Sequence, residues 1–214
     1  IRINWNPTFT PGPVPPAISA FKKLTHFDLS YTNRNGEMSA ALDALAPLIL
    51  NGSLTNSNIE HNPFTAGPVP SGYTGLFKRA AMIDRGARYC PELHKSTQCE
   101  GFSWLSFAGT NRNGDMGVSL EALLPLKDTL LMLDLGKNVH VYNNDRDFGT
   151  YNVNYYKTVD EENWKPGMNH FTPGPMPANL ASFTKLARLD LRHTNRNGML
   201  GTAALPASLE ELDL

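Results

Sequence analysis

The chain has 214 residues, 41% of them hydrophobic, which is enough for one large domain or for a run of stacked repeats. Charged residues make up only 18% and the formal net charge is −1, so there is no basic field to attract nucleic acid or an anionic membrane surface. No apolar run approaches the roughly 18 residues of a membrane span, and we expect no direct membrane insertion. The chain starts at Ile1 rather than at a Met and ends at Leu214 inside a repeated motif, so we expect a segment of a longer protein.

Two short phrases recur along the chain. The phrase Phe-Thr-x-Gly-Pro-x-Pro begins at Phe9, Phe64 and Phe171, and the phrase Thr-Asn-Arg-Asn-Gly begins at Thr32, Thr110 and Thr194. From the Phe to the first Asn of the turn that follows there are 24 residues in the first and third copies (33 − 9 and 195 − 171) and 47 in the second (111 − 64). Such repetition indicates stacked structural units, and the second copy carries 23 extra residues (47 − 24).

An L-x-x-L-x-L pattern precedes each of these Thr residues and recurs between the copies. Its last two apolar positions share one face of a short strand, because side chains alternate between faces along a strand. In chain order, the pattern predicts strands at 25–29, 103–107, 131–135, 187–191 and 210–214. Leu45, Leu48 and Leu50 form a weaker match. Asn138 follows Leu135 at the place where Thr follows the strands of the repeated phrase.

The segments between the strands predict turns and short helices. Gly-Pro-x-Pro favours an extended entry because Pro fixes φ. Apolar residues spaced by three, as in the run from Ile18 to Leu24, predict a helical or 3₁₀ turn on the outer face. After each strand the Thr turns inward to bond backbone groups, and Asn-Gly supplies left-handed conformations. We expect Arg34, Arg112 and Arg196 to brace their own turns by hydrogen bonds rather than to contact a ligand.

These motifs resemble a known family. The segment FTPGPMPANLASFTKLARLDLRHTNRNG is similar to the plant-type leucine-rich repeats of receptor ectodomains and polygalacturonase-inhibitor-like proteins, and the Thr after each strand resembles protist surface leucine-rich-repeat antigens. The resemblance implies an α/β solenoid with a parallel β-sheet on its concave face and an irregular, 3₁₀ or short-helical convex face. We interpret 1–214 as a single solenoid segment with insertions at about 79–100 and 139–167, the second with the alternating apolar residues of an irregular β-hairpin.

Cys90 and Cys99 lie in the first insertion, on either side of a polar octet. We expect them to be joined in a local disulfide, which would indicate an oxidising compartment; the alternative is two unpaired thiols in a cytosolic protein. The sequon Asn51-Gly52-Ser53 predicts glycosylation of Asn51. Together these features favour an extracellular or cell-surface location reached through the secretory pathway.

The residues that point outward from the strands are the candidates for binding. Stacking would align the aspartates of successive strands as an acidic stripe, and exposed aromatic and basic residues beside charges are typical recognition anchors. The candidate binding residues on the concave face are His26, Asp28, Tyr31, Trp104, Asp134, Lys137, Arg188, Asp190 and Arg192. The alternative is that the aspartates only add solubility and pair with neighbouring arginines.

No metal-ligand spacing, phosphate loop or nucleophile motif occurs, so we expect no cofactor, no metal site and no enzymatic activity. The turn with Asn111, Asn113 and Asp115 looks like a calcium loop, but Met199 replaces the acid in the third copy, which favours a structural turn. The favoured function is a non-catalytic recognition or adhesion module that binds a protein or a glycan. The alternative is a structural subunit of an extracellular assembly, which would bind copies of itself or other subunits.

Overall fold

The computed structural model of the chain describes residues 1, 3, 6, 8–54, 56–77, 103–136, 169–192, 194–197 and 205–214. Both expected insertions lie outside these residues, and with them the expected hairpin, the expected Cys90–Cys99 disulfide and the candidate binding residue Lys137. The buried residues share one hydrophobic core that includes Leu29, Phe107 and Leu191, as stacking of the repeats predicts.

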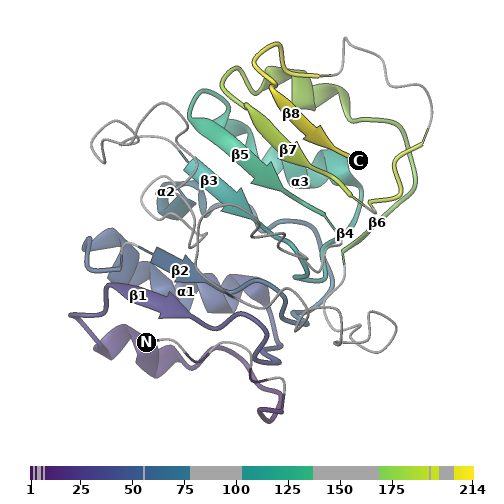
Figure 1. Cartoon of the computed structure of the whole chain (residues 1–214). Coiled ribbons are helices and arrows are strands. Elements are labelled where there is room, and N and C mark those ends of the chain that lie inside the picture. Colours follow the sequence, from purple (N-terminus) through teal and green to yellow (C-terminus); the bar gives the residue numbers. More distant parts are fainter. Residues whose placement is uncertain are drawn as a thin grey trace, which may run out of the picture.

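Short parallel strands follow one another in the order of the sequence (Figure 1). They are β1 (His26–Asp28), β2 (Asn56–Asn58), β3 (Ser103–Ser106), β5 (Leu130–Asp134), β7 (Arg188–Asp190) and β8 (Glu211–Asp213). Strand β1 pairs with β2, and β3, β5, β7 and β8 form a four-stranded sheet in which every pairing is parallel. All five strands predicted from the L-x-x-L-x-L pattern are confirmed, with ends that differ by no more than about one residue from the expected ones.

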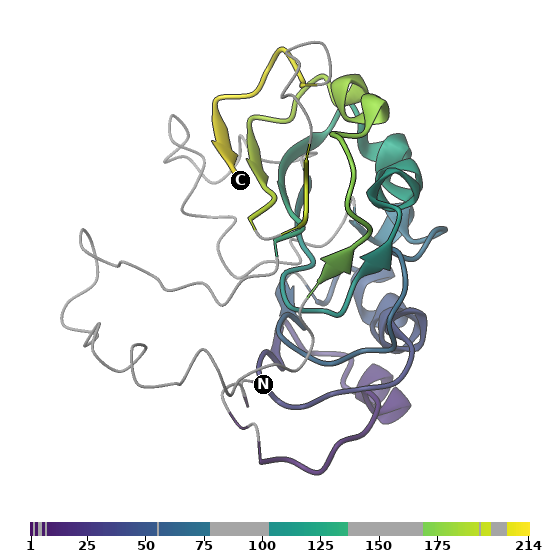
Figure 2. The same cartoon turned by 90° about the vertical axis from the view of Figure 1, so that its right-hand side faces the viewer.

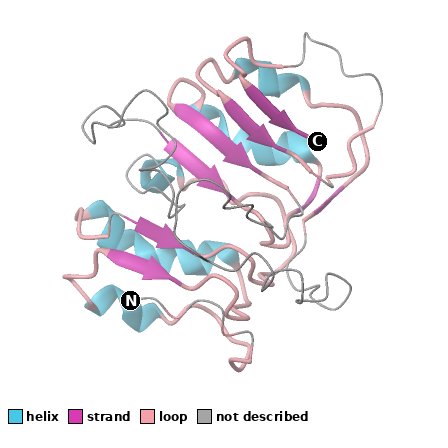
Figure 3. Cartoon of the chain, viewed as in Figure 1, coloured by secondary structure: helices cyan, strands magenta, loops and turns pink. Residues whose placement is uncertain are grey.

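Helices cover one face of these strands (Figures 2 and 3). They are η1 (Pro16–Ala20), α1 (Met38–Leu50), α2 (Thr74–Phe77), α3 (Met116–Leu123), η2 (Leu124–Leu126) and η4 (Ala178–Ser182), where η denotes a 3₁₀ helix. Elements η1 and η4 confirm the turns predicted from apolar residues spaced by three. Strand β4 (Asn113–Gly114) pairs with β6 (His170–Phe171) in a separate two-stranded parallel sheet.

Two kinds of coil alternate along the chain, a coil being one strand with the segment that leads into it. In a Thr coil, the Phe-Thr-x-Gly-Pro-x-Pro phrase leads into the strand, and a Thr follows it; β1, β3 and β7 belong to such coils. In an Asn coil, an α-helix leads into the strand, and an Asn ends the turn; α1 with β2 and α3 with β5 form such coils. The buried threonines Thr32, Thr110 and Thr194 donate from Oγ1 to the carbonyl oxygen three residues earlier, at 2.5–2.6 Å.

The asparagine that completes the β5 coil is not the expected one. Asn169 lies fully buried beside Leu135, and its Nδ2 donates to the carbonyl oxygens of Leu135 at 3.0 Å and of Phe107 at 2.9 Å. Asn138 lies outside the described residues. The asparagine that makes these bonds therefore lies 31 positions later in the sequence than the expected Asn138 (169 − 138).

Strand β2 has no counterpart among the predicted strands. Its coil has the pattern L-x-x-S-x-I-x-x-N, formed by Leu54, Ser57, Ile59 and Asn62, so a serine replaces the central leucine. The strand itself, Asn-Ser-Asn, contains no apolar residue, which is why the apolar pattern missed it. Asn62 is the signal that identifies this coil, because it makes the same bonds as Asn169.

The weaker match at Leu45, Leu48 and Leu50 was wrong: these residues belong to helix α1. Leu45 and Leu48 are fully buried, whereas Leu50 is 50% exposed, although the strand pattern would bury it. A spacing of three residues occurs both in L-x-x-L and on one face of a helix, so Leu45 and Leu48 alone do not distinguish the two. The buried Leu42, one turn earlier, reveals the helical periodicity.

Replacing Ser57 with Ala is expected to raise the free energy of unfolding by about 1 kcal/mol, because its Oγ is buried and has no hydrogen-bond partner among the described residues. Urea denaturation of both proteins would measure the difference. The matched control is Ser30→Ala, since Ser30 is also buried but its Oγ donates to Asp28 at 2.8 Å. We expect the control to be less stable than the parent protein. A loss of stability in Ser57→Ala would contradict the conclusion that the hydroxyl of Ser57 lacks a hydrogen-bond partner.

Candidate functional site

Two rows of positions lie on the face of the strands turned away from the helices, because the alternate strand residues are buried in the core. The first, which we call the variable row, consists of His26, Asn56, Trp104, Met132, Arg188 and Glu211. The second, which we call the capping row, consists of Asp28, Asn58, Ser106, Asp134, Asp190 and Asp213. The expected alignment of the outward aspartates is confirmed, since Asp134 pairs in register with Asp190, and Asp190 with Asp213.

Capping-row side chains from β1 to β7 close the turn after their own strand. In each of these strands the side-chain oxygen accepts the backbone N–H two residues later, a local turn that Asp, Asn and Ser favour. The donor–acceptor distances are 2.8–3.3 Å for Asp28 with Ser30, Asn58 with Glu60, Ser106 with Ala108, Asp134 with Gly136 and Asp190 with Arg192. The shared register of these residues thus has a structural cause.

The aspartates do not form the exposed acidic stripe that the sequence predicted. Asp28, Asp134 and Asp190 are 7%, 0% and 4% exposed. Their carboxylates are occupied by backbone N–H groups, so little of each is available to a partner. The alternative interpretation, pairing with arginine, holds at Asp190, whose Oδ2 lies 2.6 Å from Nη2 of Arg192.

Arg192 lies among the carboxylates of three adjacent strands. Its hydrogen bond with Asp190 is the largest influence and raises the pKa of Arg192; partial burial lowers it, and the charges of Asp190, Asp213 and Asp134 raise it further. The guanidinium is therefore held in this position as a counter-charge to the capping row. Its half-buried placement differs from that of a free recognition anchor.

The variable row carries a different side chain on every strand. His26 is exposed, and its Nδ1 lies 3.0 Å from Oγ1 of Thr25. Met132 is half-buried, and Nη2 of Arg188 lies 2.5 Å from Oε1 of Glu211. Trp104 pairs in register with Met132, but its side chain lies outside the described part of the structure.

Tyr31 is buried at the turn after β1, not exposed on the sheet. Its ring stacks on that of His61 with centroids 4.2 Å apart, and both residues adopt positive φ, 57° and 53°. His61 also lies against Gly109, where an added Cβ would come within 2.5 Å of its Nδ1. A left-handed backbone conformation is unfavourable for bulky residues. Close packing between the coils therefore holds Tyr31 and His61 in this conformation.

The expected bracing role of the arginines is confirmed in all three Asn-Arg-Asn-Gly turns. The Nε of each arginine donates to the carbonyl oxygen of the Thr two residues earlier, and Nη2 donates to the Thr of the Phe-Thr phrase. The first asparagine of each turn has φ near +60° and donates its Nδ2 to the Phe of that phrase. The two repeated phrases are therefore the two halves of one interlocked turn.

Arg112 makes the most complete of these braces. It is 2% exposed, and besides Thr110 and Thr65 its guanidinium bonds the carbonyl oxygen of Pro68 at 3.0 Å. Burial lowers the pKa of Arg112 to about 10, and the charge of Glu37 offsets part of that effect. The group is thus still cationic at neutral pH, held by neutral carbonyl oxygens.

Other expectations concern features outside the sheet. Asn51 lies exposed at the end of α1, where its Oδ1 accepts the N–H of Ser53 at 2.9 Å; its glycosylation stays a prediction. Within the described ranges, no group of His, Cys, Asp and Glu side chains is placed to hold a metal ion. The helices found in the same ranges are too short or too polar to cross a membrane.

Comparison with known proteins identifies similar solved structures. The chain resembles the Arabidopsis receptor kinase HAESA, solved with the peptide hormone IDA and a co-receptor, at 18% identity and a TM-score of 0.44 over 89% of this chain and 25% of that one. It also resembles the leucine-rich-repeat ectodomain of the Arabidopsis thaliana receptor kinase GASSHO1/SCHENGEN3, at 19% identity and a TM-score of 0.44 over 96% of this chain and 23% of that one. The chain thus spans about a quarter of the length of these proteins. No family model and no curated protein matches it.

Proposed function

We propose that the chain is a segment of an extracellular leucine-rich-repeat solenoid that binds a protein or peptide ligand through the variable row. The observation that carries this proposal is the contrast between the two outward rows. Capping-row residues on successive strands accept the same backbone hydrogen bond and close the same turn, whereas the variable row has a different residue on every strand. A row that the fold does not constrain is the part of the sheet whose side chains can match a ligand.

The dimensions of the sheet suit an extended peptide. Neighbouring strands lie about 4.8 Å apart, so the three intervals from β3 to β8 span about 14 Å. An extended chain advances about 3.3 Å per residue, so about four peptide residues cross the four strands. Along that path the sheet offers Met132 as an apolar contact and the Arg188–Glu211 pair as a charged one.

Selection from a displayed peptide library would test this assignment. Peptides that bind the protein are expected to lose at least about tenfold in affinity on Met132→Asp, because truncation or charge at a central contact costs more than about 1.4 kcal/mol. The matched control is Val118→Asp on helix α3, which is 53% exposed and lies on the helical side. Selected peptides that tolerate Met132→Asp but not Val118→Asp would contradict the proposal.

The assembly alternative has a different signature in solution. A recognition module is expected to sediment as a monomer over a wide concentration range, whereas an assembly subunit would form regular polymers. Sedimentation velocity at increasing protein concentration separates the two. Reversible polymers that dissociate in the Met132→Asp variant would indicate that the variable row serves self-association rather than ligand binding.

A further inference from the structure

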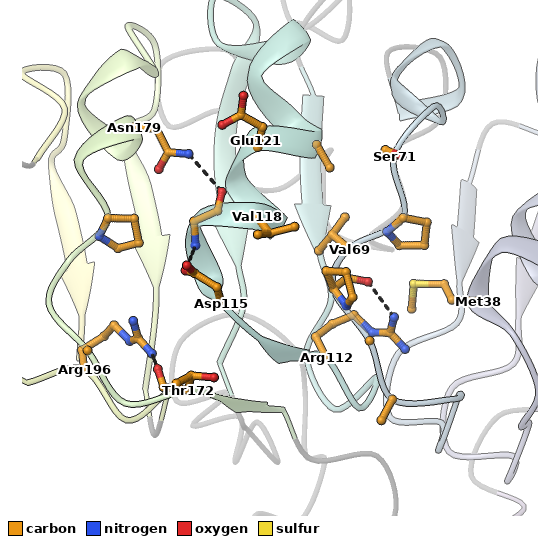
Figure 4. A pocket seen from close by; sticks show the side chains of 18 of the residues that line it. Met38, Val69, Ser71, Arg112, Asp115, Val118, Glu121, Thr172, Asn179 and Arg196 are labelled. Carbon is orange, nitrogen blue, oxygen red and sulfur yellow. Dashed lines mark hydrogen bonds between the residues drawn. The ribbon is translucent and has the colours of Figure 1, made fainter.

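A groove of about 1510 Å³ lies on the helical side of the molecule (Figure 4), and no variable-row residue lines it. Two of its walls are the Gly-Pro-x-Pro phrases 67–70 and 174–177, which belong to successive Thr coils. Helix α3 lies between them, and Glu37 and Met38 at the start of α1 line the far end. The groove is thus a product of the alternation between extended and helical coils.

One face of α3 runs along the groove. Asp115, Val118 and Glu121 line it, are exposed, and are spaced by three residues, so they form one stripe of acid, apolar residue and acid. Asp115 caps the helix with one oxygen, Oδ1, which accepts the N–H of Gly117 at 2.7 Å. At 1.5 Å rise per residue, Asp115 and Glu121 lie about 9 Å apart along the helix axis.

Carboxylates outnumber guanidinium groups in the lining of this groove, with Glu37, Asp115 and Glu121 against Arg112 and Arg196. Neither the carboxylate of Glu37 nor that of Glu121 has a hydrogen-bond or ion-pair partner among the described residues. Arg112 and Arg196 donate their N–H groups to carbonyl oxygens of the neighbouring turns, and their positive charges interact with Glu37 and Asp115, respectively. The exposed parts of Pro173, Pro175 and Val118 give the walls an apolar character.

We propose that this groove binds a polyproline-II peptide with basic residues at positions i and i+3. A polyproline-II helix has three residues per turn and rises about 3.1 Å per residue, so residues i and i+3 lie on one side about 9 Å apart. That distance matches the separation of Asp115 and Glu121. The prolines between the two basic residues pack on Val118 and on the Gly-Pro-x-Pro walls. This site is independent of the variable row.

Fluorescence polarisation with two labelled hexapeptides tests the spacing. The probe has the sequence Arg-Pro-Pro-Arg-Pro-Pro, and the control Arg-Arg-Pro-Pro-Pro-Pro has the same composition and charge. The probe is expected to bind more tightly than the control at low salt. Glu121→Gln is expected to weaken the probe about two- to fivefold, the range for an exposed ion pair, and added salt to weaken it further.

Matched variants show whether the probe binds in this groove or elsewhere on the protein. Glu210→Gln removes an exposed carboxylate immediately before β8 and is expected to leave probe binding unchanged. Met132→Asp in the variable row is also expected to leave it unchanged. Equal affinity for the two hexapeptides, or equal weakening by Glu121→Gln and Glu210→Gln, would overturn the groove assignment. Loss of probe binding on Met132→Asp alone would place the peptide on the sheet instead.

Discussion

Replacing Asn62 with Ala is expected to lower the free energy of unfolding by about 3–5 kcal/mol, because several buried backbone groups lose their partner at once. The Nδ2 group of Asn62 donates to the carbonyl oxygens of Leu29, Ile59 and Glu60 at 2.9–3.0 Å. Its Oδ1 accepts the N–H groups of Thr32 at 3.1 Å and of Arg34 at 2.9 Å. The carbonyl oxygens of Leu29 and Glu60 would each keep another donor, Oγ1 of Thr32 and the N–H of Tyr31. The carbonyl oxygen of Ile59 and the N–H groups of Thr32 and Arg34 would lose the bond that the fully buried Asn62 provides.

Chemical denaturation of two further variants would show whether the bonds between coils matter. Asn62→Thr can keep the bond within its own coil, as Thr110 does, but cannot reach both Leu29 and the N–H of Arg34. We expect it to recover about half of the loss. The control Asn197→Ala changes an exposed asparagine and is expected to stay within about 0.5 kcal/mol of the parent protein. Equal stability of Asn62→Ala and Asn197→Ala would contradict the role of this residue.

Replacing Arg112 with Ala is expected to lower the free energy of unfolding by about 2–4 kcal/mol. The guanidinium donates to the carbonyl oxygens of Thr110, Thr65 and Pro68, and all three would lose their donor. The stabilisation from these bonds must exceed the free-energy cost of burying the charge. That cost lowers the pKa of Arg112 to about 10. Because the pKa is lower in the folded than in the unfolded chain, this cost is present at neutral pH and is relieved only as the pH rises above about 10.

Arg34→Ala supplies a graded comparison for Arg112→Ala. Arg34 occupies the same turn position but is only half-buried, and its side chain bonds two carbonyl oxygens, those of Thr32 and Thr10. We expect its loss to be smaller, and both variants to retain ligand affinity. If Arg112→Ala unfolded like the parent protein but lost its ligand, the bracing role would be refuted and the binding surface would lie on this flank.

The strands of the four-stranded sheet and the role of the repeated arginines were predictable from sequence, because both depend on local patterns that recur. Leu189 and Leu191 alternate with outward residues in the same way as Leu133 and Leu135, and one buried row is enough to set the register. The arginines recur with their turn, so their shared role followed from their shared surroundings. No long-range information was needed for either.

Other parts of the fold depended on contacts between distant residues. Strand β2 was missed because Ser57 replaces an apolar residue, and its coil is identified instead by the bonds of Asn62 to the previous coil. Asn169 could not be found by spacing, since 33 residues separate it from Leu135 (169 − 135 − 1). Only the three-dimensional structure shows that it fills the position expected for Asn138.

The candidate binding site shows the same limit. The outward register of Asp28, Asp134 and Asp190 was predictable, but their burial was not, because it depends on turn closure after each strand. Tyr31 was expected on the sheet surface and instead stacks on His61 from the next coil. Sequence alternation fixes which side of a strand a residue faces, whereas the later turn decides whether solvent reaches it.

Hydroxyl-radical footprinting of the protein with a peptide selected from the displayed library tests the central claim most directly. Two half-buried methionines report on the two surfaces, Met132 in the variable row and Met176 in the groove beside α3. We expect the selected peptide to protect Met132 from oxidation and to leave the oxidation of Met176 unchanged. Protection of Met176 with unchanged oxidation of Met132 would contradict recognition through the variable row.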